Sequence, residues 1–339
     1  MNLDYDPQGG FNMIPFFVLD RRASLEILKG LFLKFPNLKF GLMTHANASS
    51  QFMELFRAFP YKTRLKYFDA WEEINETKIN RMLKKNIVKI SDSGVFQKNG
   101  SNHTYEELFE KYVQLKVHYG IIKDVLHDMK ATLKSAEEAI NVYEDNGFKR
   151  KFKLIGVAQG NNADEYKKCY GMLQDLGYKY IAIGGLLKRN GNSNYVTVRS
   201  EELLQQTISL IRDEYSPKWL FVLGVYHPNR HELLDNLGVW GADYKGWLFH
   251  YDEFYRNAMK ELEEQGRINK EIREKYELFL KYKIQYLQTK SPQARKRYWE
   301  SRKELDKTLK KYGTSLQELR FREVRERLEK EVVAKMLKK

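Results

Sequence analysis

The chain has 339 residues, 42% of them hydrophobic, which predicts one large domain with a buried core plus an appendage and excludes a disordered or fibrous protein. Lysine and arginine total 59 against 45 aspartates and glutamates, and the net charge of +14 makes a polyanion the first partner to expect. The single cysteine excludes a disulfide framework or a thiolate zinc cluster within the chain, so a reducing cytoplasm is the expected location.

Eight short apolar runs in the first 245 residues predict β-strands. The runs are nearly continuous in Val, Ile, Leu and Phe, which is typical of parallel strands covered on both faces. The expected strands span residues 11–19, 39–44, 86–94, 119–125, 153–160, 180–185, 219–226 and 238–244.

Helix-forming segments separate these strands. The expected helices span residues 23–35, 104–116, 135–147, 162–177 and 201–215. Two of them end at Gly147 and Gly177, where the residue after a helix favours a left-handed conformation. Repeated alternation of strand and helix predicts an α/β fold. Eight strands favour a closed (β/α)8 TIM-type barrel over residues 1–250, with an open doubly wound sheet as the alternative.

Residues 251–339 are rich in charge and in helix formers, and they predict a basic helical C-terminal extension. Basic side chains beside Tyr298 and Trp299 are typical of a surface that holds a phosphate backbone and stacks on bases. The alternative is an amphipathic helix whose apolar face packs on the barrel. The candidate nucleic-acid-binding residues are Arg295, Lys296, Arg297 and Arg302.

Polar residues and glycines follow several predicted strands, where a parallel barrel carries its active site. A carboxylate accepts hydrogen bonds from N1 and N2 of guanine, an amide or backbone N–H serves O6, and glycine lets a ligand approach the backbone. The alternative is ordinary turn or cap chemistry for Asp92, Asp124 and the Gln159–Gly160 pair, and relief of crowding at the barrel rim for the two glycines at 184 and 185. The candidates are Asp92, Ser93, Gly94, Phe96, Asp124, Gln159, Gly160, Gly184, Gly185 and Asp243.

Four of these strand ends carry motifs in a specific order. Residues 92–97 read Asp-Ser-Gly-Val-Phe-Gln, residues 156–160 read GVAQG, residues 183–186 read IGGL, and residues 223–228 read LGVYHP. They resemble the Asp-Ser-Gly-Gly-Phe-Gln, GIVQGG, VGGL and GVGTP motifs of the guanine transglycosylases. These enzymes swap guanine in nucleic acid for a 7-deazaguanine. The resemblance covers roughly residues 86–246.

The resemblance implies a role for each matched residue. Asp92 matches the acid/base aspartate that protonates the departing guanine and deprotonates the incoming base. Asp124, Gln159 and Gly185 match base-recognition positions, with Gly184 as a second close-approach glycine. Phe96 would form an apolar wall. The resemblance implies no cofactor.

The nucleophile is the main departure from the family. Its members place an attacking aspartate three residues after the first aspartate of a Gly-x-Asp-x-x-Asp stretch, for a covalent glycosyl intermediate. Asp243 matches that first aspartate, and Gly246 falls at the nucleophile position. Either Asp243 has taken the role, or the alignment slips, or the chain has lost the covalent step.

The acceptor is also open. Family members acting on tRNA carry a cysteine-rich zinc site that one cysteine cannot form, and the segment around Asp124 resembles the branch, found in phages and genomic islands, that inserts a base such as preQ0 into DNA. We therefore expect a DNA enzyme, in the host cytoplasm if viral. The alternatives are a tRNA enzyme and a non-catalytic nucleic-acid-binding barrel that partners an active relative. A homodimer is compatible with the sequence.

The sequence lacks a metal-binding motif and lacks segments typical of membrane or secreted proteins. His227 and His231 lack the glutamate of an HExxH frame, so no metal site is expected. No run of about 18 apolar residues and no signal peptide occurs, so neither a membrane nor secretion is expected.

Overall fold

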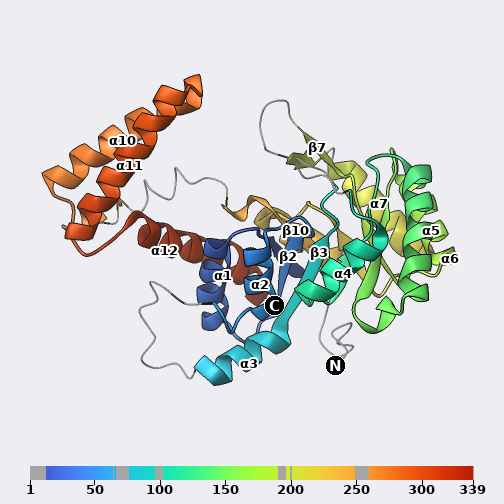
Figure 1. Cartoon of the computed structure of the whole chain (residues 1–339). Helices are drawn as coiled ribbons and strands as arrows, with labels where there is room; N and C mark the ends of the chain where they lie inside the picture. Colours follow the sequence, from blue (N-terminus) through green and yellow to red (C-terminus); the bar gives the residue numbers. More distant parts are fainter. Residues whose placement is uncertain are drawn as a thin grey trace. The chain divides into compact units, whose positions relative to one another are not determined.

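The computed structural model describes the chain except for a few segments, and eight of its strands close into a parallel barrel (Figure 1). The described residues are 13–63, 65, 76–95, 102–189, 196–198, 201–248, 259–260 and 262–338. The strands are β1 (Ile14–Val18), β2 (Phe40–His45), β3 (Ile87–Asp92), β4 (Tyr119–Ile121), β5 (Lys153–Ala158), β6 (Tyr180–Ile183), β9 (Leu220–Val222) and β10 (Gly241–Tyr244). Their order around the barrel is β1-β10-β9-β6-β5-β4-β3-β2. The predicted (β/α)8 TIM-type barrel is confirmed.

Helices connect successive strands. They are α1 (Arg22–Lys34), α2 (Ser50–Ala58), α3 (Glu76–Asn86), α4 (Tyr105–Leu115), α5 (Met129–Asp145), α6 (Ala163–Asp175), α7 (Glu201–Tyr215) and α8 (His231–Asn236). The left-handed residues predicted after two helices are confirmed, with φ of 68° at Gly147 and 95° at Gly177. An antiparallel pair that the sequence did not predict, β7 (Leu187–Arg189) and β8 (Val196–Val198), follows β6.

Helix α5 begins six residues before the predicted start at residue 135. The Asp128 side chain accepts a hydrogen bond from the Ala131 N–H at 2.9 Å and so caps a helix that starts at Met129. The predicted helix is therefore longer by six residues, and its first turn contacts the loop after β4, where the Val125 N–H donates to Thr132 Oγ1 at 2.9 Å.

One aromatic ring identifies the interior of the barrel. The Phe16 ring on β1 lies 5.0 Å from that of Phe221 on β9 and 5.5 Å from that of Trp240. A Cβ atom added to Gly41 on β2 would lie 2.1 Å from Phe16, and one added to Gly241 on β10 would lie 2.7 Å from it. Because β1, β2, β9 and β10 all meet at this ring, Phe16 fills the centre of the barrel.

Aromatic side chains also pack together at the amino-terminal ends of the strands. Tyr119 lies 5.3 Å from Tyr180 and 5.4 Å from Trp219, and Trp219 lies 4.9 Å from Trp240. Lys153 places its ammonium over the rings of both tyrosines. This layer closes one end of the barrel, so the polar site lies at the opposite end.

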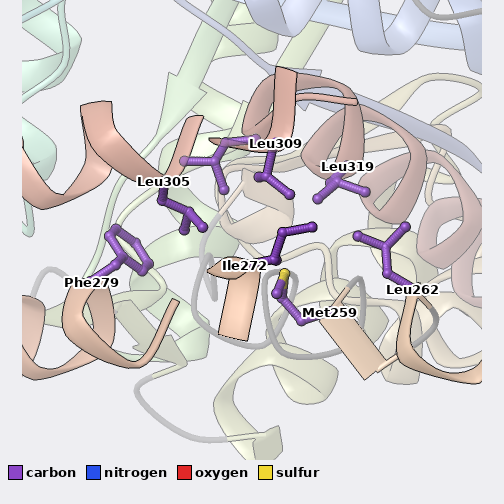
Figure 2. Close-up of a cluster of buried hydrophobic side chains, with 8 residues drawn as sticks. Met259, Leu262, Ile272, Phe279, Leu305, Leu309 and Leu319 are labelled. Carbon is purple, nitrogen blue, oxygen red and sulfur yellow. The ribbon is translucent and has the colours of Figure 1, made fainter. Parts of the chain in front are cut away.

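The described residues form two compact units, one holding those up to Trp247 and those from Lys330, the other those from Leu248 to Glu329. The second unit contains helices α10 (Lys270–Thr289), α11 (Pro292–Lys311) and α12 (Leu316–Leu328). It has its own apolar core, shown in Figure 2, whose buried members are Met259, Leu262, Ile272, Phe279, Leu305, Leu309, Leu316 and Leu319. The extension is therefore a packed helical unit. No helix in the described ranges is long and apolar enough to span a membrane.

Candidate active site

Side chains at the carboxyl ends of β2, β3 and β10 point into the barrel. Side chains alternate along a strand, so His45 lies on the same inner face as Gly41, and Asp243 lies on the same inner face as Gly241. Asp92 is the register partner of His45 on the neighbouring strand and shares its face. The two predicted catalytic aspartates therefore both face the interior at the end of the barrel opposite the aromatic layer.

Asp124 and Gln159 form a buried hydrogen-bonded pair after β4 and β5. Gln159 Nε2 donates to Asp124 Oδ2 at 2.6 Å, and the His127 N–H donates to Gln159 Oε1 at 3.2 Å. Gln159 is completely buried and Asp124 is 5% exposed. The pair combines an amide and a carboxylate, the groups that can read the O6 and N1 edge of guanine, and in this structure the two bond to each other.

Gly184 and Gly185 lie directly against this pair. A Cβ atom on Gly184 would lie 2.7 Å from Gln159 Nε2 and 3.3 Å from Asp124 Oδ2, and one on Gly185 would lie 2.3 Å from Gln159 Oε1. Gly185 also has a φ of 70°, which only glycine adopts at low cost. These glycines were expected to let a ligand approach the backbone, and in the structure the Gln159 side chain occupies the space that both leave open.

Gly160 is in close contact with the first turn of α6. A Cβ atom there would lie 2.7 Å from the backbone nitrogen of Tyr166. Glycine at this position therefore allows helix α6 to begin directly after β5.

Asp92 ends β3 and leads into a tight turn. Burial raises the pKa of its carboxyl group, while hydrogen bonds from the Ser93 and Gly94 backbone and the charge of Lys245 act in the opposite direction. Gly94 adopts a φ of 82°, and its carbonyl accepts a 3.4 Å hydrogen bond from Asn47 Nδ2. Ser93 is buried. Phe96, the predicted apolar wall, lies outside the described residues.

Asp243 is 6% exposed and accepts a short hydrogen bond from the Gly224 N–H through Oδ1. The pKa of Asp243 is raised to about 7, mainly by burial. The Gly224 hydrogen bond opposes this rise, and the charge of Asp92 contributes to it. Gly246, the position of the family nucleophile, begins a short 3-10 turn and has no side chain to offer. Asp243 is thus the carboxylate that this part of the chain brings to the barrel mouth.

The three aspartates interact electrostatically. The pKa of Asp124 is raised to about 7, mainly by burial and in addition by the charge of Asp92. Asp92 therefore acts on both Asp124 and Asp243, and near neutral pH the group holds fewer than three negative charges. Carboxyl groups that share protons in this way can serve as acid and base in one reaction.

Two residues that the sequence analysis did not select complete this rim. His45 follows the apolar run of β2, and Lys245 lies one residue beyond β10, exposed and close enough to influence Asp92, Asp243 and His45. Both lie at the carboxyl end of a barrel strand, the position from which the aspartates were selected as candidates; we call this criterion the strand-end rule.

The predicted nucleic-acid-binding residues all lie on α11 in the second unit. Arg295, Lys296 and Arg297 are exposed. Arg302 is partly buried and stacks its guanidinium 5.0 Å from the ring of Trp299. Arg302 is therefore partly engaged within the unit, and Lys296 lies 3.9 Å from the carboxylate of Glu300 on the same helix, an exposed ion pair.

No protein-family model matches this chain, and a search of curated proteins found no match. The fold and the site define a parallel (β/α)8 barrel with three interacting aspartates at its mouth. Within the described segments, no group of three or more His, Cys, Asp or Glu side chains is placed to hold a metal ion.

Proposed function

We propose that this protein exchanges guanine in DNA for a 7-deazaguanine base such as preQ0. The observation that carries the proposal is the arrangement around Asp92. The Asp124–Gln159 pair with Gly184 lies on strands to one side of it, and Asp243 lies across the barrel mouth. The Asp124–Gln159 pair can form hydrogen bonds with the edge of guanine. Asp92 lies between this pair and Asp243, where an acid can protonate the base while a nucleophile attacks the sugar.

The reaction follows from these positions. An oxygen of ionised Asp243 attacks C1′, the C1′–N9 bond breaks, and its electron pair leaves with guanine, which takes a proton from Asp92. The incoming base then gives a proton to Asp92, its N9 attacks C1′, and the bond to Asp243 breaks. Burial raises the pKa of Asp92 and so favours the protonated acid that the departing guanine needs. With a pKa of about 7, Asp243 is partly ionised at neutral pH, and the ionised form attacks.

The motif order and the charge support nucleic acid as the substrate. The four strand-end motifs resemble those of guanine transglycosylases, and a net charge of +14 favours a polyanion. A base inside a duplex must be extruded before its C1′ can be reached, at a cost of a few kcal/mol. The exposed cations of α11 in the second unit would bind phosphate groups of the DNA.

The test is base exchange in duplex DNA that contains radiolabelled guanine, with preQ0 supplied in solution. We expect the wild type to release label, and Asp92→Asn and Asp243→Asn to release at least about 1,000-fold less, because each removes a group that bonds to or protonates the substrate. Asp175→Asn, a change at an exposed residue of α6, is the matched control and should exchange at the wild-type rate.

The other outcomes are equally specific. Exchange into tRNA and not into DNA would replace DNA with tRNA as the acceptor. Tight, salt-dependent DNA binding without exchange, unaffected by Asp243→Asn, would contradict the enzyme and favour a non-catalytic partner.

A further inference from the structure

His45 has a nitrogen that the described protein leaves without a partner. The residue ends β2, faces the barrel mouth and is paired in register with Asp92. Its Nδ1 is shielded from solvent, and within the described part of the chain no group forms a hydrogen bond to it. Buried polar atoms are nearly always paired, so an unpaired one beside a candidate catalytic acid points to a ligand.

Burial and two charged groups act on the imidazole. Burial lowers the pKa of His45, the charge of Lys245 lowers it further, and Asp20, which follows β1, raises it. The net effect is downward, so the ring is neutral at pH 7 and has one donor and one acceptor nitrogen.

The strand order places His45 on a particular side of the site. The base-reading group comes from β4, β5 and β6, beyond Asp92 on β3. His45 on β2 and Lys245 after β10 lie on the other side of Asp92. In a nucleotide the sugar and phosphate extend from the base beyond the bond that is cleaved. A base held beside Asp124 therefore directs its sugar and phosphate toward His45 and Lys245.

We propose that His45 and Lys245 form a sugar-phosphate subsite, in which His45 Nδ1 hydrogen-bonds to a sugar or phosphodiester oxygen and the Lys245 ammonium binds the adjacent phosphate. This inference rests on the proposed function, because it assumes that a base occupies the pocket beside Asp124. Lys245 is exposed, as a phosphate ligand must be.

Two probes separate the halves of the site: a duplex with one abasic site, which offers sugar and phosphate without a base, and free preQ0, which offers a base alone. His45→Phe keeps the ring shape without nitrogen, and His45→Asn places an amide near the position of Nδ1. We expect His45→Phe to weaken binding of the abasic duplex about tenfold, as for one lost hydrogen bond, and to leave preQ0 affinity within about twofold of wild type. His45→Asn should recover most of the loss.

Lys245→Met should weaken binding of the same duplex and reduce the slope of log affinity against log salt by about 1. The matched control is His118→Asn, at the opposite end of the barrel, where Nδ1 of His118 accepts from the Lys89 N–H at 2.9 Å and an amide oxygen can replace it. This variant should bind both probes as the wild type does.

Wild-type affinity of His45→Phe for the abasic duplex would overturn the inference, as would an equal loss of preQ0 affinity, which would place His45 on the base side. Guanine release by the wild type decides the proposed function separately. Without release, a selective loss of duplex binding in His45→Phe still supports the subsite, and unchanged binding still refutes it.

Discussion

At the scale of single residues, the strand-end rule found most of the polar groups at the barrel mouth. Asp92, Asp124, Gln159 and Asp243 could be selected from the sequence because each directly follows an apolar run, and the structure brings all four to the same end of the barrel. The rule applied equally to His45, which was passed over because histidines are scattered through this sequence without ligand spacing.

The orientation of Gln159 could not be predicted. The two glycines after β6 were expected to admit a ligand, and they instead accommodate an amide that is hydrogen-bonded to Asp124. A side-chain rotamer depends on contacts between strands that are distant in sequence, and a strand pattern does not contain them. If the proposed function holds, base recognition should depend on Gln159 keeping this position.

Gly185→Ala tests that dependence. The new methyl group would lie 2.3 Å from Gln159 Oε1 at a backbone φ of 70°, so both strain and displacement of Gln159 are expected. We expect the free energy of unfolding to fall by about 3 kcal/mol and guanine exchange to fall at least about tenfold. Chemical denaturation and the exchange assay measure these effects.

Gly177→Ala is the matched control for this substitution. Gly177 also has a positive φ, 95°, but no atom lies within 4 Å of its added Cβ. It should cost only the left-handed backbone strain, about 1–2 kcal/mol, without loss of exchange. Equal losses in the two variants would show that contact with Gln159 does not matter at Gly185.

At the scale of elements, the strands were easier to predict than the helices that cover them. All eight barrel strands were expected, because a parallel strand buried on both faces needs a continuous apolar run, which few other structures produce. Helices α2 and α3 and the β7–β8 pair were not expected. The short α2 begins at a Ser49 cap, where the hydroxyl accepts from the Phe52 N–H at 3.3 Å. The start of α2 could not be predicted from this cap, because it consists of a single serine and many loops also contain serine.

Helices α10 and α11 carry a second pattern that bears on partner binding. Residues 278–299 contain six lysines and arginines and no acidic residue. Exposed Ile284, Leu287 and Trp299 lie among these cations. Farther along α11, cations are interspersed with acids, as in the 2.7 Å ion pair between Lys310 and Asp306. The stretch from residue 278 to residue 299 is therefore better suited to a phosphate backbone, although Lys296 forms an ion pair with Glu300, just beyond its end.

Replacing Arg295, Lys296 and Arg297 together with alanine should weaken DNA binding and reduce the salt slope of log affinity by about 2 to 3, the value for three lost phosphate contacts. Lys303→Ala with Lys307→Ala, at exposed positions of the acid-containing part of α11, is the control and should change the slope by less than about 1. The measurement is fluorescence anisotropy of a labelled duplex over a series of salt concentrations. Equal slopes for wild type and the triple variant would exclude this surface from DNA binding.

At the scale of the whole molecule, the sequence predicted the barrel and a helical extension, because near residue 250 the apolar strand-like runs give way to charged, helix-forming residues. It did not predict that residues from Lys330 group with the barrel and not with the other C-terminal helices. The grouping depends on contacts between the end of the chain and residues far earlier, such as the 2.8 Å ion pair of Lys335 with Glu232 on α8. A helical pattern contains no information about such a partner.

The stability of the whole chain should depend on the aspartates at the barrel mouth. The pKa values of Asp124 and Asp243 are about 7 in the folded protein, against about 4 in an unfolded chain. Between pH 4 and pH 7 the folded state keeps protons that the unfolded state loses, so the free energy of unfolding decreases as pH rises through this window and levels off above it. Burial of a carboxylate is the physical cause.

Asp124→Asn isolates this effect, since its amide oxygen can still accept the hydrogen bond from Gln159. We expect the variant to be more stable than the wild type by about 1–3 kcal/mol at pH 8 and equally stable at pH 4. A shift of three pKa units would give at most about 4 kcal/mol, and the expected gain is smaller because the charges of the three aspartates are coupled. Urea denaturation at both pH values measures the difference. Asp175→Asn should leave the unfolding free energy within a few tenths of a kcal/mol of wild type at both. If Asp124→Asn instead retained the full wild-type decrease in stability between pH 4 and pH 8, Asp124 would be ionised in the folded protein throughout that range, and the barrel mouth would have to hold its charge by contacts other than those with Gln159.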